Sequence, residues 1–155
     1  MLSRSPVIAI ILLAGLATPQ SIYAGDDAPD NSVKYRHKSM EALGKRMSMV
    51  NMIVKGEMSR EKDLAGHARA MNDIAKTLPE LWPKGSLKDS ESKKEIWDKW
   101  DDFLAECKSF EEATAAMLVA TEGHDLTATK AAYETVGNAC GSCHDKYRVE
   151  EEDEK

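Results

Sequence analysis

The residues with the clearest chemical potential are two cysteines and a histidine near the C-terminal end of the chain, Cys140, Cys143 and His144. They form the pattern C-x-x-C-H, in which two thiols add to the vinyl groups of a porphyrin and the imidazole binds its iron. On a helix, positions i, i+3 and i+4 share one face, so all three side chains could reach one macrocycle. The motif therefore predicts one covalently attached haem c, with Cys140 and Cys143 as anchors and His144 as an axial iron ligand.

Three other uses of this motif receive less support. A zinc site needs two more ligands, but the chain has no second cysteine pair, and His37, His67 and His124 lie on separate segments. A redox dithiol normally sits where a strand enters a helix, and a structural disulfide would leave His144 without a role. The third cysteine, Cys107, is far from the pair in sequence. We expect it to be a buried free thiol, with a redox or dimerising role as the alternative.

Helical periodicity places the motif in the last of four predicted helices. Apolar residues recur at steps of three and four in the stretches 32–56, 59–78, 92–122 and 126–147. Ser59 is the predicted N-cap of the second stretch, and Ser92 begins a capping box for the third. Residues 79–91, rich in turn formers, are the longest predicted loop. No segment alternates with a period of two, so we expect an all-α, antiparallel up-down-up-down four-helix bundle that holds the haem covalently.

The two ends of the chain are predicted to lie outside this bundle. Residues 1–24 combine a basic residue, the apolar run 7–16 and a small residue at Ala24, which is typical of a secretory signal peptide that is removed. The haem domain would then span residues 25–149, and the charged residues 150–155 would be a solvated acidic tail. Export to an oxidising compartment agrees with haem attachment and predicts a periplasmic location.

Charge and composition exclude several classes of function. The 155 residues include 27 acidic and 21 basic side chains, which gives a net charge of −6. Removing residues 1–24 takes away Arg4 and no acid, so the predicted mature chain has a charge of −7. A nucleic-acid binder would normally be positive, and no later stretch approaches the ~20 apolar residues of a transmembrane helix. No acid–base pair or nucleophile stands out beside the haem motif, so we do not expect an enzyme.

Several short motifs accompany the haem motif in a definite order. They are V-K-Y-R at 33–36 leading to Met40, V-K-G-E at 54–57, L-W-P-K-G-S at 81–86, I-W at 96–97 and V-G-N-A-C-G-S-C-H-D-K-Y-R at 136–148. This order resembles the class II cytochromes c, the family of cytochrome c′ and the low-spin cytochromes c-556. The resemblance implies that the haem lies within the bundle, that His144 is the fifth iron ligand, and that Arg148 lies near a haem propionate or the proximal imidazole. Without the resemblance, the sequence supports equally well that Arg148 is a solvated arginine near the acidic tail.

The resemblance leaves the sixth coordination position to be decided. In cytochrome c′ an apolar side chain of the first helix covers the iron, whereas in the c-556 type a methionine of that helix binds it. The matching residue is Met40, which we expect to be the distal ligand because it lies centrally on the apolar stripe and residues 40–57 resemble the c-556 type. Gly44, one turn further on, would let the helix approach the porphyrin. His37, about 60° around the helix from Met40, is the rival ligand, and packing without ligation is the other alternative.

These assignments lead to two candidate functions. With His144 and Met40 on the iron, we expect single-electron transfer between unidentified redox partner proteins in the periplasm. The alternative is a five-coordinate haem that binds nitric oxide or carbon monoxide. The negative net charge favours basic partner surfaces. The resemblance allows a dimer through the first two helices, and the sequence does not decide between monomer and homodimer.

Overall fold

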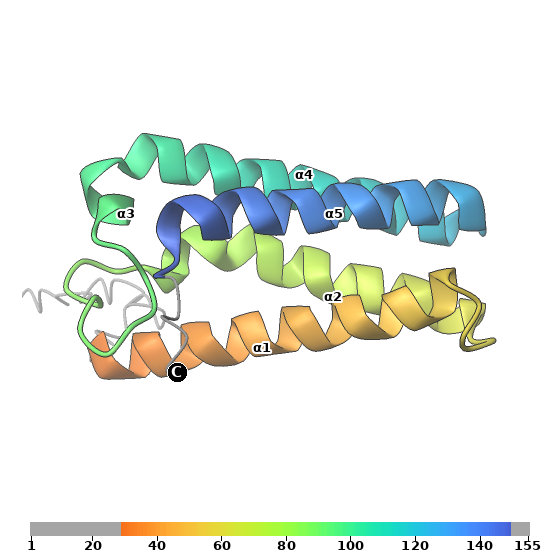
Figure 1. Cartoon of the computed structure of the whole chain (residues 1–155), viewed down its shortest axis with the longest axis horizontal. Coiled ribbons are helices and arrows are strands. Elements are labelled where there is room, and N and C mark those ends of the chain that lie inside the picture. The colour runs from red at the N-terminus through yellow and green to blue at the C-terminus, as the bar shows by residue number, and fades with distance from the viewer. Residues whose placement is uncertain (1–28, 150–155) are drawn as a thin grey trace, which may run out of the picture.

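The repeating apolar positions become four long helices in the computed structural model, which describes residues 29–149 (Figure 1). These helices are α1 Pro29–Val54, α2 Leu64–Thr77, α4 Trp100–Glu122 and α5 Leu126–Tyr147. Three short elements join them, namely the 3₁₀ helices η1 Glu61–Asp63 and η2 Leu78–Leu81 and the single turn α3 Glu95–Asp98. Successive long helices run in opposite directions, so the predicted all-α, up-down-up-down bundle is confirmed. The predicted signal peptide 1–24 and tail 150–155 lie outside the described residues.

The helix ends follow from local sequence chemistry at two of the predicted stops. Gly56 follows α1 with φ 73°, a left-handed conformation that glycine adopts without a steric penalty. Its amide donates to the Ile53 carbonyl at 2.9 Å, which closes the last turn. Between α4 and α5, residues 123–125 form the predicted break. Asp125 caps α5 by accepting a hydrogen bond from the Ala128 amide at 2.8 Å.

The prediction of one continuous helix over 92–122 is wrong. Lys99, with φ −126° and ψ 50°, leaves the helical conformation and separates α3 from α4. The apolar spacing continues across this break, because Ile96 before it and Phe103 after it are both buried in the core. Periodicity alone therefore could not reveal the break.

The two predicted serine caps are also wrong. Ser92 does not cap α3. Its hydroxyl instead accepts a hydrogen bond from Trp82 Nε1 at 2.9 Å, so it is engaged in a tertiary contact. Ser59 lies before η1, and the residue that precedes α2 is Asp63, which makes no side-chain capping bond.

The core draws side chains from all four long helices. Val50 of α1, Met71 of α2, Phe103 and Met117 of α4 and Val136 of α5 are each 0% exposed. Leu126, the first residue of the predicted helical stretch 126–147, is 44% exposed and so does not belong to the apolar face that this stretch was expected to bury. Within residues 29–149, no helix has both the length and the apolar character needed to span a bilayer.

Candidate haem site

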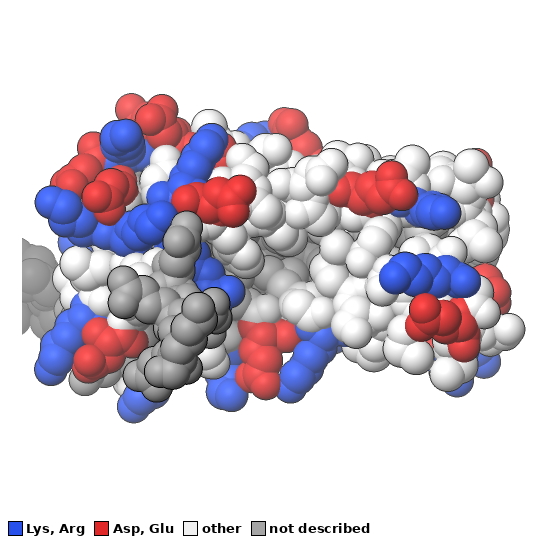
Figure 2. All heavy atoms as spheres, in the orientation of Figure 1, with Lys and Arg blue, Asp and Glu red and all other residues white. Residues whose placement is uncertain are grey.

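A large cavity lies beside α1 and α5, at the end of the bundle where α5 finishes. Its volume is about 710 Å³, which falls within the range of small-molecule and cofactor sites. Figure 2 shows the molecule hollowed between these two helices, with uncharged atoms lining the hollow and charged side chains along its lower edge. Phe103 and Phe110 of α4 contribute aromatic surface to the cavity wall. The cavity is therefore mainly apolar, as a site for a flat macrocycle requires.

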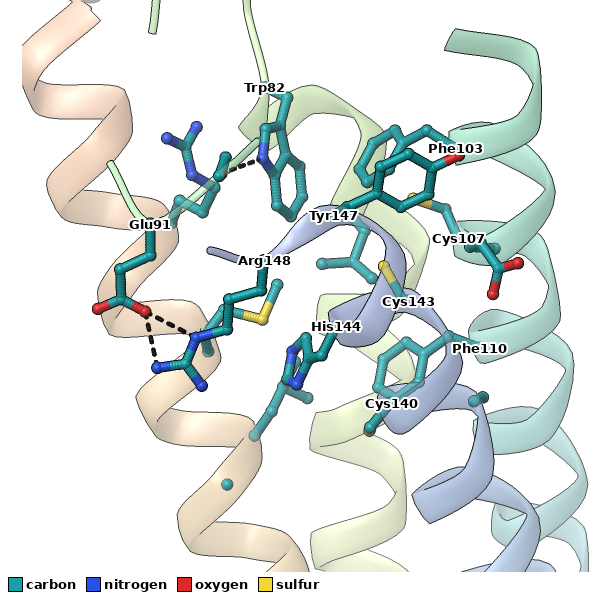
Figure 3. Close-up of a pocket in the computed structure, with 18 of the residues that line it drawn as sticks. Trp82, Glu91, Phe103, Cys107, Phe110, Cys140, Cys143, His144, Tyr147 and Arg148 are labelled. Atoms are coloured by element: carbon teal, nitrogen blue, oxygen red, sulfur yellow. Dashed lines mark hydrogen bonds and ion pairs between the residues drawn. The ribbon is translucent and has the colours of Figure 1, made fainter. Parts of the chain in front are cut away.

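The haem motif lies on the wall formed by the last turns of α5. Cys140, Cys143 and His144 all line the cavity, and Figure 3 shows them on successive turns of that helix. The two free thiols are half-buried. Burial raises the pKa of Cys140, and it raises the pKa of Cys143 to about 11. Burial first and the Arg148 charge second lower the pKa of His144, which favours the neutral imidazole that binds metals.

The first helix supplies the residues that we considered for the opposite coordination position. Met40, Gly44 and His37 all line the same cavity from α1. Met40 is half-buried, and a Cβ added at Gly44 would have no neighbouring heavy atom within 4 Å. The His37 side chain is 62% exposed, and its Nδ1 lies 3.8 Å from a Glu91 carboxylate oxygen. Met40 is therefore the less exposed of the two candidate ligands.

Arg148 lines the cavity, and contacts between residues 147–149 and residues 91–93 hold it in place. Its Nε and Nη2 atoms both lie 2.9 Å from Glu91 Oε2, as the dashed lines in Figure 3 show. The backbone reinforces this contact, because the Val149 amide donates to the Glu91 carbonyl at 2.8 Å and the Lys93 amide donates to the Tyr147 carbonyl at 2.7 Å. The Arg148 side chain is still 44% exposed. Arg148 therefore has a feature of each predicted role: it lines the cavity, as a residue near the haem would, and it is partly solvated, as a terminal surface arginine would be.

Arg36, for which the sequence alone indicated no individual role, lines the cavity and is only 5% exposed. Its guanidinium donates to the Leu81 carbonyl at 2.7 Å, to Ser86 Oγ at 3.1 Å and carbonyl at 2.9 Å, and to Ser90 Oγ at 2.8 Å. It also lies 5.2 Å from the centroid of the Trp82 ring. Burial lowers its pKa. One signal in the sequence marks it, because Arg36 occupies the apolar stripe three residues after Val33.

The charge of Arg36 bears on what the cavity holds. The four hydrogen-bond acceptors of Arg36 are all neutral, and no ion pair joins it to a carboxylate within residues 29–149. A buried cation without a counter-charge is costly, so this wall of the cavity is complementary to an anionic group. Haem has an apolar body, vinyl groups, an iron and propionate carboxylates. The cavity offers a chemically matching group for each of these parts: aromatic side chains for the apolar body, two thiols for the vinyl groups, an imidazole for the iron and a buried guanidinium for a propionate.

The remaining residues of interest lie in or around this site. Cys107 is 5% exposed and lines the cavity from α4, so the predicted buried thiol is confirmed. Burial raises its pKa to about 12. His67 and His124 do not line the cavity. Among the other methionines, Met47 lines the cavity, whereas Met49, Met52 and Met58 are 38–44% exposed.

Comparison with known proteins agrees with this site. Cytochrome c-554 of Cereibacter sphaeroides is 32% identical over 149 residues, which cover 92% of this chain and 97% of that protein. Cytochrome c-556 of Agrobacterium fabrum is 30% identical over 152 residues, which cover 96% of this chain and 99% of that protein. The structure of a mutant cytochrome c′ from Alcaligenes xylosoxidans in complex with nitric oxide matches with a TM-score of 0.76. It covers 82% of this chain and 100% of its own at 21% identity, which supports the fold alone.

A family model described as cytochrome C′ matches residues 31–148, which include every cavity residue discussed above and all of the helices except the first two residues of α1. Proteins of that family are non-enzymatic haem proteins, typically periplasmic, and the family implies a covalently bound haem c. The match spans well over half of the sequence, and relatives at 30% identity or more align over nearly its full length. The chain therefore belongs to the cytochrome c′ family, the class II cytochromes c.

Proposed function

We propose that this chain is a periplasmic cytochrome that carries single electrons through a haem iron held by His144 and Met40. The observation that carries the proposal is that a half-buried thioether, Met40, lines the same cavity as the C-x-x-C-H motif. When bound, the haem supplies a one-electron couple at its iron. An imidazole and a thioether are the axial pair used by electron-transfer cytochromes c, in which the thioether raises the potential.

The other cavity residues have roles that suit such a carrier. Cys140 and Cys143 would hold the macrocycle through thioether bonds. Phe103 and Phe110 keep water from its apolar body, and Arg36 provides a fixed positive charge for a propionate. Because the loop contacts of Arg36 join α1 to residues 81–90, they also hold the helix that presents Met40. We infer that little of this frame needs to move when the iron changes its oxidation state.

The second candidate function is the binding of nitric oxide or carbon monoxide by a five-coordinate iron. Two observations favour it. A Cβ at Gly44 would meet open space on the same helix as Met40, and a relative that is 30% identical over 78% of this chain is itself a cytochrome c′. In this case Met40 would pack over the iron without binding it.

The absorption spectrum of purified holoprotein distinguishes the two functions. We expect low-spin spectra in both oxidation states, and we expect Met40→Ala to give a high-spin haem with a lower reduction potential that binds carbon monoxide readily. Met47→Ala is a matched control, because it removes a methionine from the same helix and the same cavity wall. If the unmodified protein is already high-spin in both states, the gas-binding function replaces electron transfer.

Mild acidification distinguishes iron ligation by Met40 from ligation by His37. A thioether has no proton to gain in the accessible pH range, so Met40 ligation predicts low-spin spectra that persist under mild acid. An imidazole ligand from His37 would be lost as it protonates. We expect His37→Ala to leave the spectrum unchanged, and a loss of the low-spin bands in that variant would make His37 the ligand.

Covalent attachment is tested separately from ligation. We expect the denatured protein to keep its colour through extraction with acidified acetone, and the Cys140→Ser/Cys143→Ser variant to lose it. Complete release of haem from the native protein would refute thioether attachment through these cysteines.

A further inference from the structure

Glu106 of α4 is an acidic residue of the cavity wall that the proposed function does not use. Three acidic side chains line the cavity, and Glu106 is the least exposed of them. Its side chain is 14% exposed, compared with 37% for Glu41 and 51% for Glu91. Of the three acidic side chains, that of Glu106 is therefore the one least screened by solvent.

The carboxylate is held against the turn of α5 that carries a haem anchor. Glu106 forms an ion pair with Lys146, which lies three residues after Cys143 on the same helix. Lys146 is the main reason why the pKa of Glu106 lies below its usual range. Glu106 is therefore ionised at neutral pH.

The two charges of this pair are not equally screened. The Lys146 side chain is 56% exposed, whereas that of Glu106 is 14% exposed. Solvent screens an exposed charge far more strongly than one in a low-dielectric wall. Glu106 and the haem anchor Cys143 line the same cavity. The net field of the pair inside the cavity is thus negative.

We propose that Glu106 is a potential-setting residue, whose carboxylate in the cavity wall lowers the reduction potential of the haem. Ferric haem carries one more positive charge than ferrous haem, so a fixed negative charge beside it favours the oxidised state. Lys146 acts in the opposite direction and limits the effect. The inference rests on the proposed haem attachment to Cys140 and Cys143, but it does not depend on Met40 as the ligand.

The test is a spectroscopic redox titration of the holoprotein and its variants at about pH 8, well above the usual pKa of a glutamate. Glu106→Gln keeps the shape and removes the charge. We expect it to raise the potential by a shift that corresponds to a roughly threefold change in the ferrous-to-ferric ratio, or about 30 mV for one electron. Lys146→Gln should lower the potential, because the carboxylate then acts without its partner.

Glu112→Gln is the matched control, since it removes an acid from the solvent face of the same helix, where the side chain is 69% exposed. It should leave the potential nearly unchanged. Opposite shifts in the Glu106 and Lys146 variants identify a charge effect, whereas distortion of the site would move both potentials in the same direction. The proposal is overturned if Glu106→Gln shifts the potential no more than Glu112→Gln, or if the two pair variants shift it alike. A failure of haem attachment would be recognised separately, as colourless protein after extraction.

Discussion

Replacing Arg36 tests whether a buried cation holds the loop of residues 81–90 against α1. Arg36→Ala removes a side chain that is 5% exposed and makes four hydrogen bonds of 2.7–3.1 Å to that loop. A hydrogen bond from a charged donor contributes about 1.5–3 kcal/mol, so the four together contribute roughly 6–12 kcal/mol before other costs. Burial of the guanidinium costs the unmodified protein several kcal/mol of hydration, and the alanine variant does not bear that cost. We therefore expect a net loss of about 3 kcal/mol, a large part of the stability of a typical domain.

Denaturant unfolding of the holoprotein, followed by circular dichroism, measures this loss as a lower midpoint at constant slope. Arg36→Lys is the informative companion variant. It keeps the charge but lacks the planar fork that reaches several acceptors at once, so it should recover less than half of the lost stability. Arg60→Ala, which removes an exposed arginine paired with Asp63, should leave the midpoint nearly unchanged. A loss below about 1 kcal/mol in Arg36→Ala, or full recovery by lysine, would refute the idea of a geometric clamp.

Three further predictions follow from the burial and capping contacts. Thiol reagents should label Cys107 in native holoprotein only after unfolding, because the side chain is 5% exposed, and rapid labelling of the native protein would contradict this. Burial raises the pKa of Cys107 from 9.0 to about 12, so its contribution to stability is complete below about pH 9. That contribution is lost as the pH rises toward 12, and the slope of unfolding free energy against pH in this window should become smaller in Cys107→Ala. Asp125→Ala should cost about 1 kcal/mol in denaturant unfolding through loss of the α5 cap, whereas Asp101→Ala, at an exposed site in the first turn of α4, should cost clearly less.

The periodicity of apolar residues was sufficient to predict the bundle, because each long helix buries one face in a shared core. The predicted stretch 126–147 matches α5 at both ends, and the break at residues 123–125 depends on local turn chemistry that the sequence displays. The same periodicity placed the haem motif on one helix face. These features are local, so a reading of neighbouring residues could find them.

Contacts between distant segments account for the features that the sequence did not reveal. Ser92 has the spacing of a capping residue, but its hydroxyl accepts a hydrogen bond from Trp82 Nε1 instead of capping a helix. Lys99 breaks the third helix at a point where the apolar spacing continues. Arg36 stands 45 to 54 residues from its hydrogen-bond acceptors. None of these partners can be identified from the residues adjacent in sequence, although an arginine on an apolar stripe was a signal that a buried cation was present.

The size of the cavity links the stability of the bundle to its cofactor. A bound group that fills this space of about 710 Å³ would remove the apolar side chains that line it from water, which stabilises the folded protein by about 25 cal/mol per Å² of apolar surface buried. The cavity wall also contains the buried charge of Arg36, which an apolar occupant could not compensate. A group that suits this cavity would therefore supply both apolar surface and negative charge. Haem anchored at Cys140 and Cys143 meets both requirements, and in this family it would complete the core as well as supply the redox centre.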